Sequence, residues 1–222
     1  MSNDLSRRNM LATAGAAAAT LAGAALAAEP QRKVRIIGVS CSPRKGKTTA
    51  AALAVALEAA AKVSPAVETE LIELAGMNIP VFAPGGDKGD FVKLMPRLAD
   101  PAVGGIIIGT PVYFCSPSSL CKAFLDHCGA FRAGNFALRN KVGGVLAVGG
   151  VRNGGQELTI QCVQAVLMCQ EMVVVGDGRP TAHTGATLLN DGKDDISGDT
   201  FGLTTARNLG TRVAEVALAL SR

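Results

Sequence analysis

The stretch of the sequence best suited to chemistry is residues 42–49, which read SPRKGKTT. Backbone N–H groups at the start of a helix favour an anion, and an arginine can bind two oxygens of one phosphate at once. Hydroxyl groups add further donors. Five side chains in this stretch suit a phosphate: Ser42, Arg44, Lys47, Thr48 and Thr49. These residue types predict a phosphate site where a strand passes into a helix.

The end of this stretch also matches part of a P-loop, the phosphate-binding loop of nucleoside triphosphatases. Residues 46–48 read GKT, but the pattern needs a glycine five residues earlier, where the sequence has Cys41. Such enzymes also need an acid for magnesium at the end of a nearby strand. The apolar runs GGIIIGT and GGVLAVGG end without one, and Asp177 follows a run expected far from the loop. The sequence therefore favours a phosphate other than that of a triphosphate.

A second distinctive stretch, residues 109–119, reads GTPVYFCSPSS and contains Tyr113, the only tyrosine of the chain. The two prolines stiffen it. Adjacent aromatic rings can cover a flat ligand ring, and the alternative is that they pack onto the protein core. A thiol at this place could be redox-active, although a packing role is favoured. The candidate contact residues are Pro111, Val112, Tyr113, Phe114 and Cys115.

A third stretch, residues 149–157, reads GGVRNGGQE. Its glycines let the backbone approach a ligand closely, although an ordinary glycine-rich turn has the same composition. Backbone donors here could bond the polar edge of a ring, and Arg152 could stabilise negative charge developing on it. The candidates are Gly149, Gly150, Val151, Arg152 and Gly154. A phosphate site, an aromatic wall and a polar edge together suit a phosphorylated aromatic cofactor such as FMN.

The elements that must position these loops alternate between strand and helix. Expected strands cover residues 33–40, 67–74, 103–110, 141–150 and 172–177. Expected helices cover residues 48–63, 90–100, 118–131, 155–172 and 201–220, with Pro96 kinking the second or ending it early. Such alternation predicts an α/β fold with a parallel sheet covered on both faces. We expect a flavodoxin-like three-layer sandwich with five strands in the order 2-1-3-4-5, whose ligand site lies at the carboxyl ends of the strands.

The first 30 residues are typical of an export signal. Arg7 and Arg8 precede an apolar run rich in alanine and glycine, and small residues suit cleavage after Ala27. The paired arginines indicate a twin-arginine signal over residues 1–27, followed by one FMN-binding domain over residues 28–222. An uncleaved membrane anchor is the alternative. The twin-arginine route carries folded proteins, often with a cofactor inserted, so a periplasmic protein that meets the membrane only during export is expected.

Charge and composition disfavour nucleic acid as a partner. The signal contains two arginines and one aspartate, so its removal takes the net charge from +4 to +3, too mild to suggest nucleic acid. Aromatic residues are few and tryptophan is absent, which disfavours stacking on the bases of single-stranded nucleic acid.

His127 and His183 are expected to be structural or solvated, and no metal site is expected. An acidic stretch near residues 191–195 lacks calcium-loop spacing and is expected to be solvated.

Six cysteines follow the signal, without a C-x-x-C pair. Cys121 and Cys128 are seven residues apart, as are Cys162 and Cys169. Each pair is expected on one helix face, about 10 Å apart, too far for a disulfide within the pair. Small buried side chains are the favoured interpretation, and a disulfide between elements in an oxidising periplasm stays open.

At the three loops the sequence resembles the NADPH-dependent FMN reductase group of flavodoxin-like proteins, particularly its iron–sulfur flavoprotein branch. That branch commonly shows Gly-Ser-Pro-Arg-Lys, two small or glycine residues, then Asn-Thr, where this chain reads CSPRKGKTT. GTPVYF is similar to its Ser-Pro-Val-Tyr-Phe-Gly loop. The resemblance implies FMN held by its phosphate at Ser42, Arg44, Lys47, Thr48 and Thr49. The ring would lie by residues 111–115 and 149–154, and a homodimer or homotetramer with flavins near the interfaces is implied.

Departures from that pattern are specific. Cys41 and Cys115 replace glycines, Thr48 replaces an asparagine, and Lys47 replaces a small residue. The branch also places a compact cysteine cluster after its second strand, whereas residues 72–90 contain no cysteine here. We therefore predict no iron–sulfur cluster of that kind.

These observations favour an exported FMN oxidoreductase of the NADPH-dependent FMN reductase type, with no side chain assigned as catalytic acid or base. NAD(P)H is a candidate donor, but it is cytoplasmic, so a cytochrome, a quinol pathway or another periplasmic donor protein is also considered. The alternative is a flavodoxin-like electron-transfer protein without its own small-molecule substrate. A third hypothesis, a binding module that has lost its flavin site, draws on Cys41 and Thr48.

Overall fold

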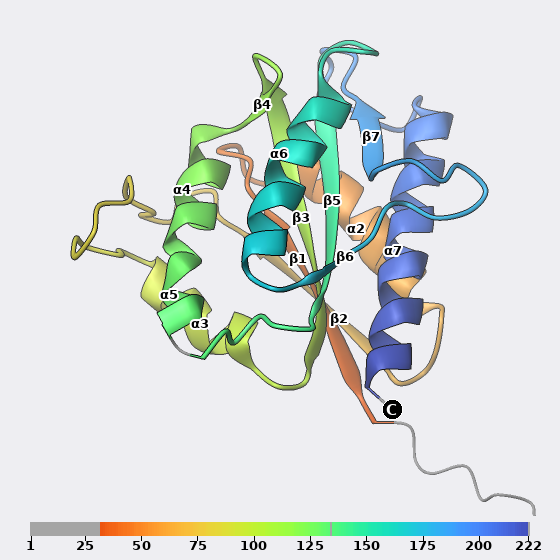
Figure 1. Ribbon diagram of the computed structural model, residues 1–222. Coiled ribbons are helices and arrows are strands. Elements are labelled where there is room, and N and C mark those ends of the chain that lie inside the picture. The colour runs from red at the N-terminus through yellow and green to blue at the C-terminus, as the bar shows by residue number, and fades with distance from the viewer. Residues whose placement is uncertain (1–31, 134, 222) are drawn as a thin grey trace, which may run out of the picture. The chain divides into compact units, whose positions relative to one another are not determined.

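A computed structural model describes residues 32–133 and 135–221 (Figure 1). The predicted signal peptide, residues 1–27, lies outside the described residues. The central sheet is parallel, with the order β2-β1-β3-β5-β6. Its strands are β1 (Val34–Ser40), β2 (Val67–Glu73), β3 (Val103–Tyr113), β5 (Val142–Gly149) and β6 (Val173–Val174). The predicted order 2-1-3-4-5 is confirmed, because β4 (Ser116–Pro117) is only a short antiparallel extension of β3.

Helices cover both faces of the sheet, as the three-layer prediction requires. Residues of α2 (Thr48–Ala61) and α7 (Thr200–Leu220) share one buried apolar cluster with the sheet. Residues of α3 (Phe91–Ala99), α4 (Ser119–His127), α5 (Gly129–Ala133) and α6 (Gln156–Cys169) share the cluster on the other face (Figure 1). A close approach joins α2 and α7, since a Cβ atom at Gly210 would lie 1.8 Å from the Ala56 carbonyl oxygen.

The fifth strand position differs from the prediction. The expected strand over 172–177 stops after Val174, and the chain returns as β7 (Ala186–Leu189), which pairs with the upper half of β5. The buried carboxylate of Asp177 accepts hydrogen bonds from the Thr181 hydroxyl and the His183 amide. Asp177 therefore closes the loop between β6 and β7. Its carboxylate bonds within that loop, whereas a magnesium ligand would face the loop after β1.

Two expected helices also differ in detail. Pro96 does not end α3, which continues to Ala99. The carbonyl that loses its helical partner to this proline is that of Val92, an exposed residue, so water can satisfy it. The helix expected over 118–131 is divided into α4 and α5 at Cys128. In the described part of the chain, no helix combines the length and the apolar character needed to cross a membrane.

Candidate functional site

Four loops meet at the carboxyl edge of the sheet, at the top of Figure 1. Ser40 at the end of β1 pairs with Gly109 of β3, and Gly149 at the end of β5 pairs with Leu189 of β7. β3 and β5 are themselves neighbours in the sheet. The loops after β1, β3 and β5 are the three singled out in the sequence. The fourth, the acidic loop of residues 190–199, was not expected there, because β7 itself was not predicted.

The loop after β1 has two layers. Ser42, Thr48 and Thr49 are buried, and the Ser42 hydroxyl accepts a hydrogen bond from the Arg44 amide at 3.1 Å. Arg44 and Lys47 form the outer layer, with side chains 50% and 46% exposed. The structure thus brings all five predicted residues together, but only the two cations are well exposed.

The start of α2 is suited to an anion. Its N-cap residue, Lys47, supplies no side-chain hydrogen bond to the helix, whereas Ser118 and Asp199 cap α4 and α7 with theirs. Gly46, just before it, has a φ of +66°, a conformation that favours glycine. Backbone N–H groups at the first turn of a helix carry partial positive charge and attract phosphates. The local backbone therefore adds to the charge of Arg44 and Lys47.

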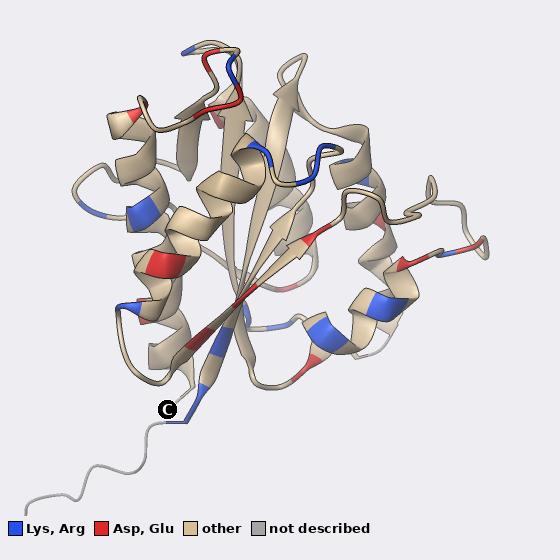
Figure 2. Cartoon of the chain, turned by 180° about the vertical axis from the view of Figure 1, so that it is seen from behind, with Lys and Arg blue, Asp and Glu red and all other residues tan. Residues whose placement is uncertain are grey.

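Two carboxylates already contact this loop. Asp194 of the acidic loop bridges the cations, with Oδ1 at 2.6 Å from Arg44 Nη1 and Oδ2 at 3.2 Å from Lys47 Nζ. Glu73, at the end of β2, accepts a hydrogen bond from the Gly46 amide at 2.7 Å. The hydrogen bond from Arg44, followed by that from Lys47, lowers the pKa of Asp194. Figure 2 shows the acidic segment and the basic loop at the same end of the sheet. The loop thus binds carboxylates through the donors that a phosphate would use.

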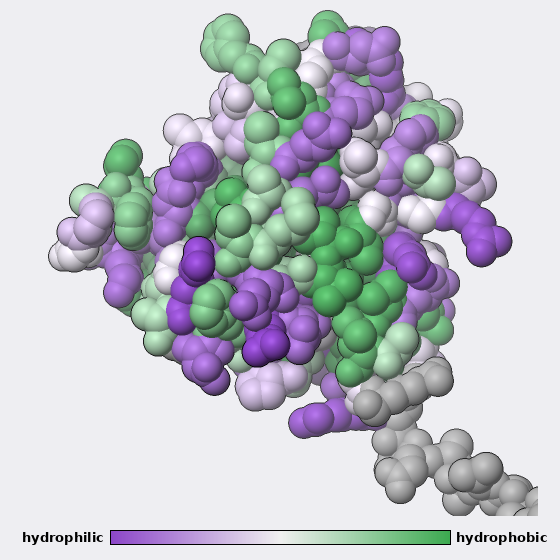
Figure 3. Space-filling model, viewed as in Figure 1, coloured by the Kyte–Doolittle hydropathy of each residue, from purple (hydrophilic) through white to green (hydrophobic). Residues whose placement is uncertain are grey.

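The loop after β3 is a hairpin with an unusual tip. Phe114 and Cys115 both have positive φ, +53° and +59°, where two-residue turns normally carry asparagine or glycine. Tyr113 is 45% exposed and Phe114 is fully exposed, so these rings do not pack into the core. Apolar side chains project at this end of the molecule in Figure 3. Backbone conformations of this kind are costly and tend to occur at functional sites.

The hairpin is fixed to both neighbouring loops. The Ser118 hydroxyl donates to the Cys41 carbonyl at 2.7 Å, which ties the hairpin to the loop after β1. The Cys115 thiol donates to the Gly154 carbonyl at 3.8 Å. Gly155 has a φ of +98°, and a Cβ atom there would lie 2.7 Å from Cys115 Sγ. The sequence reasoning missed Ser118 and Gly155, although a glycine directly before a helix was a visible signal.

The glycine-rich loop after β5 is held from inside by Gln156. Its side-chain amide donates to the Val151 carbonyl and accepts from the Gly154 amide, both at 2.8 Å. Gly149 is buried, whereas Gly150, Val151 and Arg152 are exposed. The loop therefore presents a fixed backbone to solvent beside the hairpin tip.

Arg152 has partners that the sequence did not indicate. Its guanidinium bonds the carboxylate of Asp199 and lies 6.0 Å from the centre of the Phe201 ring. The Asp199 side chain is only 5% exposed, and it also accepts from the Leu189 amide at 2.7 Å. Arg152 thus joins the glycine-rich loop to the acidic loop. Its predicted role near a ligand ring stays a prediction.

The six cysteines separate into a buried group and an exposed group. All six cysteines are free; Cys41, Cys121 and Cys128 are buried, which confirms the packing interpretation for these three. Burial raises the pKa of the Cys41 and Cys128 thiols. That interpretation is wrong for Cys115, Cys162 and Cys169, which are exposed.

Both histidines have the structural or solvated character that was predicted. His127 is buried, stacks on Phe91 and donates from Nε2 to the Pro80 carbonyl at 2.9 Å. His183 is half-exposed. The described residues contain no group of three or more His, Cys, Asp or Glu side chains placed to hold a metal ion.

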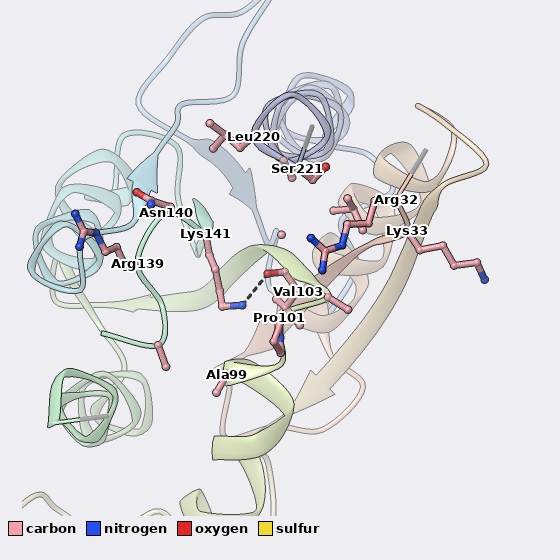
Figure 4. A pocket seen from close by; sticks show the side chains of 15 residues that line it. Arg32, Lys33, Ala99, Pro101, Val103, Arg139, Asn140, Lys141, Leu220 and Ser221 are labelled. Atoms are coloured by element: carbon pink, nitrogen blue, oxygen red, sulfur yellow. Dashed lines mark hydrogen bonds between the residues drawn. The ribbon is translucent and has the colours of Figure 1, made fainter. Parts of the chain in front are cut away.

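A cavity of about 380 Å³ lies at the opposite, amino-terminal edge of the sheet (Figure 4). Lys141 reaches into it and donates from Nζ to the carbonyls of Asp100 at 2.7 Å and Val103 at 2.8 Å. Burial lowers the pKa of Lys141 to about 8. Residues at the carboxyl-terminal ends of α3 and α7 line the same cavity, and the negative ends of helix dipoles disfavour an anion there. Lys141 directly precedes β5. Its hydrogen bond to Val103 ties the start of β5 to the start of β3.

Sequence comparisons find related proteins that match most of the chain. The sequence model described as NADPH-dependent FMN reductase matches residues 34–187. An iron–sulfur flavoprotein of Methanocaldococcus jannaschii is 42% identical over 198 residues, which cover 82% of this chain and 97% of the relative. An NAD(P)H dehydrogenase (quinone) of Paracoccus denitrificans is 36% identical over 196 residues, covering 78% of this chain and 88% of the relative.

Solved structures show the same fold. RosB with a bound derivative of riboflavin 5′-phosphate superposes with a TM-score of 0.66 at 15% identity, covering 84% of this chain and 80% of RosB. A flavodoxin, WrbA-like protein of Agrobacterium tumefaciens gives a TM-score of 0.57 at 20% identity, covering 83% of this chain and 97% of that protein. These likenesses confirm the predicted flavodoxin-like architecture.

Proposed function

Because the chain belongs to the NADPH-dependent FMN reductase family, we propose that it is an FMN-dependent oxidoreductase with its cofactor across the loops at the carboxyl edge of the sheet. The observation that carries this proposal is the loop after β1. It combines an uncapped helix start with two exposed cations, and two carboxylates already contact its donors. An anionic group of a ligand fits the same donors.

The residues present fit FMN. Arg44 and Lys47 would hold its phosphate, and the exposed hairpin tip beside the fixed glycine-rich loop would hold its ring. Bound FMN supplies the electron-transfer chemistry, while the protein binds and orients the cofactor and its surroundings. Ser42, Thr48 and Thr49 are buried in the same loop, and their contact with the phosphate stays a prediction. We assign no side chain as catalytic acid or base.

The residues do not fit the iron–sulfur cluster that the names of several relatives contain. Residues 72–90 have no cysteine. Among the described residues, the buried cysteines do not form a group placed to bind a metal, and the other three are dispersed over the hairpin and α6.

We also propose that the protein acts in the periplasm. The twin-arginine motif in residues 1–27 supports export of the folded holoprotein to the periplasm, with cleavage after Ala27. Because NAD(P)H is cytoplasmic, a periplasmic donor protein is then needed as an alternative reductant. The exposed aromatic hairpin supports assembly as a homodimer or homotetramer. Sedimentation of the purified protein would measure the mass of the assembly.

Kinetics separate the enzyme from the electron-transfer alternative. The FMN-loaded protein is mixed with NADPH or NADH and a quinone, a ferric chelate or free flavin as acceptor. Rapid oxidation of the nicotinamide supports a reductase. If the bound flavin is reduced only by a protein partner, the electron-transfer alternative replaces the reductase.

A further inference from the structure

The acidic loop contains one residue that contacts both exposed cations of the loop after β1. The two oxygens of Asp194 contact different cations, Arg44 at 2.6 Å and Lys47 at 3.2 Å. A terminal phosphate bridges neighbouring cations through separate oxygens in the same way. Residues 34–187, which match the family model, do not include Asp194.

We propose that Asp194 competes with the cofactor phosphate for Arg44 and Lys47, so that its carboxylate must release both cations before the phosphate binds. The inference rests on the proposed FMN site. A phosphate monoester carries a charge of about −1.5 to −2 near neutral pH. A carboxylate kept beside it would repel it and would occupy the donors that it needs. Asp194 therefore lowers the affinity for the phosphate end of the cofactor and has no effect on the ring end.

The contacts of Asp194 are of a kind that a ligand can displace. Its side chain is 31% exposed, and ion pairs at such exposure contribute little stability. Besides these two ion pairs, Asp191, Asp194 and Asp195 form hydrogen bonds and an ion pair, among the described residues, only with partners inside residues 190–197. Asp199, nearly buried, anchors the end of the loop through Arg152 and the Leu189 amide. The tip of the loop can therefore move while its base stays fixed.

Glu73 makes a similar contact one residue away. Glu73 accepts a hydrogen bond from the Gly46 amide at 2.7 Å, whereas Asp194 contacts the ammonium group of Lys47. Glu73 lies at the end of β2 and is paired in the sheet with Ser40, so it is less free to leave than Asp194. We therefore assign the displaceable contact to Asp194.

The test compares FMN with riboflavin, which differ only in the phosphate. Flavin is removed from wild type, Asp194→Asn and Asp191→Asn, and both ligands are titrated by quenching of flavin fluorescence. Asparagine has nearly the shape of aspartate and tolerates the φ of +58° at residue 194. Asp191 is the matched control, because it lies in the same loop and its one ion pair among the described residues is with Lys193, at 3.8 Å.

We expect Asp194→Asn to bind FMN about three- to tenfold more tightly, the range of two weak surface ion pairs. Riboflavin binding should not change, and Asp191→Asn should match wild type with both ligands. Unchanged or weaker FMN binding in Asp194→Asn would overturn the inference, and weaker binding would mean that Asp194 positions the cations for the phosphate.

Failure of the proposed function would look different. If wild type binds neither flavin, the FMN proposal is wrong, and inorganic phosphate becomes the probe. The amide signals of Gly46 and Lys47 are followed by NMR during a phosphate titration of the same three proteins. Tighter phosphate binding by Asp194→Asn alone supports the competition, and equal or weaker binding overturns it.

Discussion

Substitution of Gly155 by alanine tests how the aromatic hairpin is held against the glycine-rich loop. The residue has a φ of +98°, and a new Cβ atom would lie 2.7 Å from Cys115 Sγ, 2.8 Å from its Cα and 2.9 Å from its Cβ. All three distances are well below the contact distance of about 3.5–4.0 Å between carbon atoms. The hairpin tip must therefore move or the helix start must shift.

The expected loss of stability follows from these two terms. A residue with a Cβ atom in a left-handed conformation costs about 1–2 kcal/mol, and overpacking of a close contact costs about 1–3 kcal/mol. With partial relaxation, Gly155→Ala should lower the free energy of unfolding by about 2–4 kcal/mol. Gly150→Ala is the matched control in the same loop, because a Cβ atom there meets no atom within 4 Å. It should change the free energy by no more than about 0.5 kcal/mol.

Urea unfolding of both variants measures the difference, and FMN titration measures its effect on the site. Gly155→Ala should also bind FMN more weakly, since it displaces the tip that carries Phe114. On a Cys115→Gly background, which removes two of the three clashing atoms, the cost of Gly155→Ala should fall by about 1 kcal/mol or more. Equal stability of the two alanine variants would refute the contact between these loops as described.

Three further outcomes follow from single contacts. Arg44→Ala should weaken FMN binding about tenfold and leave riboflavin binding unaffected, as expected for one exposed charge-assisted hydrogen bond. Lys45→Ala is the control, because the Lys45 side chain has no ion pair in the described structure. Equal effects of the two variants on FMN binding would exclude a specific role for Arg44. Ser118→Ala removes the cap of α4 and leaves the buried Cys41 carbonyl without its 2.7 Å donor, so urea unfolding should show a loss of about 2 kcal/mol. Burial lowers the pKa of Lys141 from 10.5 to about 8, so the folded protein loses this proton before the unfolded chain does. Stability should therefore rise between pH 8 and 10.5, by at most about 3 kcal/mol, and urea titrations of Lys141→Met should lack this rise; an identical pH profile would contradict the burial effect.

The fold could be predicted because the central strands β1, β3 and β5 are apolar on both faces, and because a stretch with helical periodicity separates each strand from the next. The three loops were visible for a related reason, since glycine, proline and basic residues interrupt that pattern. Seven-residue spacing placed Cys162 and Cys169 on one face of α6, and both are exposed. Spacing alone does not say whether the shared face is the buried one, so their burial was predicted wrongly.

The acidic partners of the site could not be predicted in the same way. Asp194 lies 150 residues from Arg44 in the sequence, and its loop reaches the site only because β7 pairs with β5. The sequence predicted no β7, since this four-residue strand follows a polar loop closed by Asp177. A long-range ion pair of this kind depends on the whole topology.

The most direct test of the account is the cofactor of the protein purified after export with its own signal. An absorbance spectrum is recorded, and the ligand released by denaturation is identified by mass. We expect a yellow protein that releases FMN, about one molecule per chain. A colourless protein that also fails to bind added FMN would contradict the central claim that the loop after β1 holds a flavin phosphate.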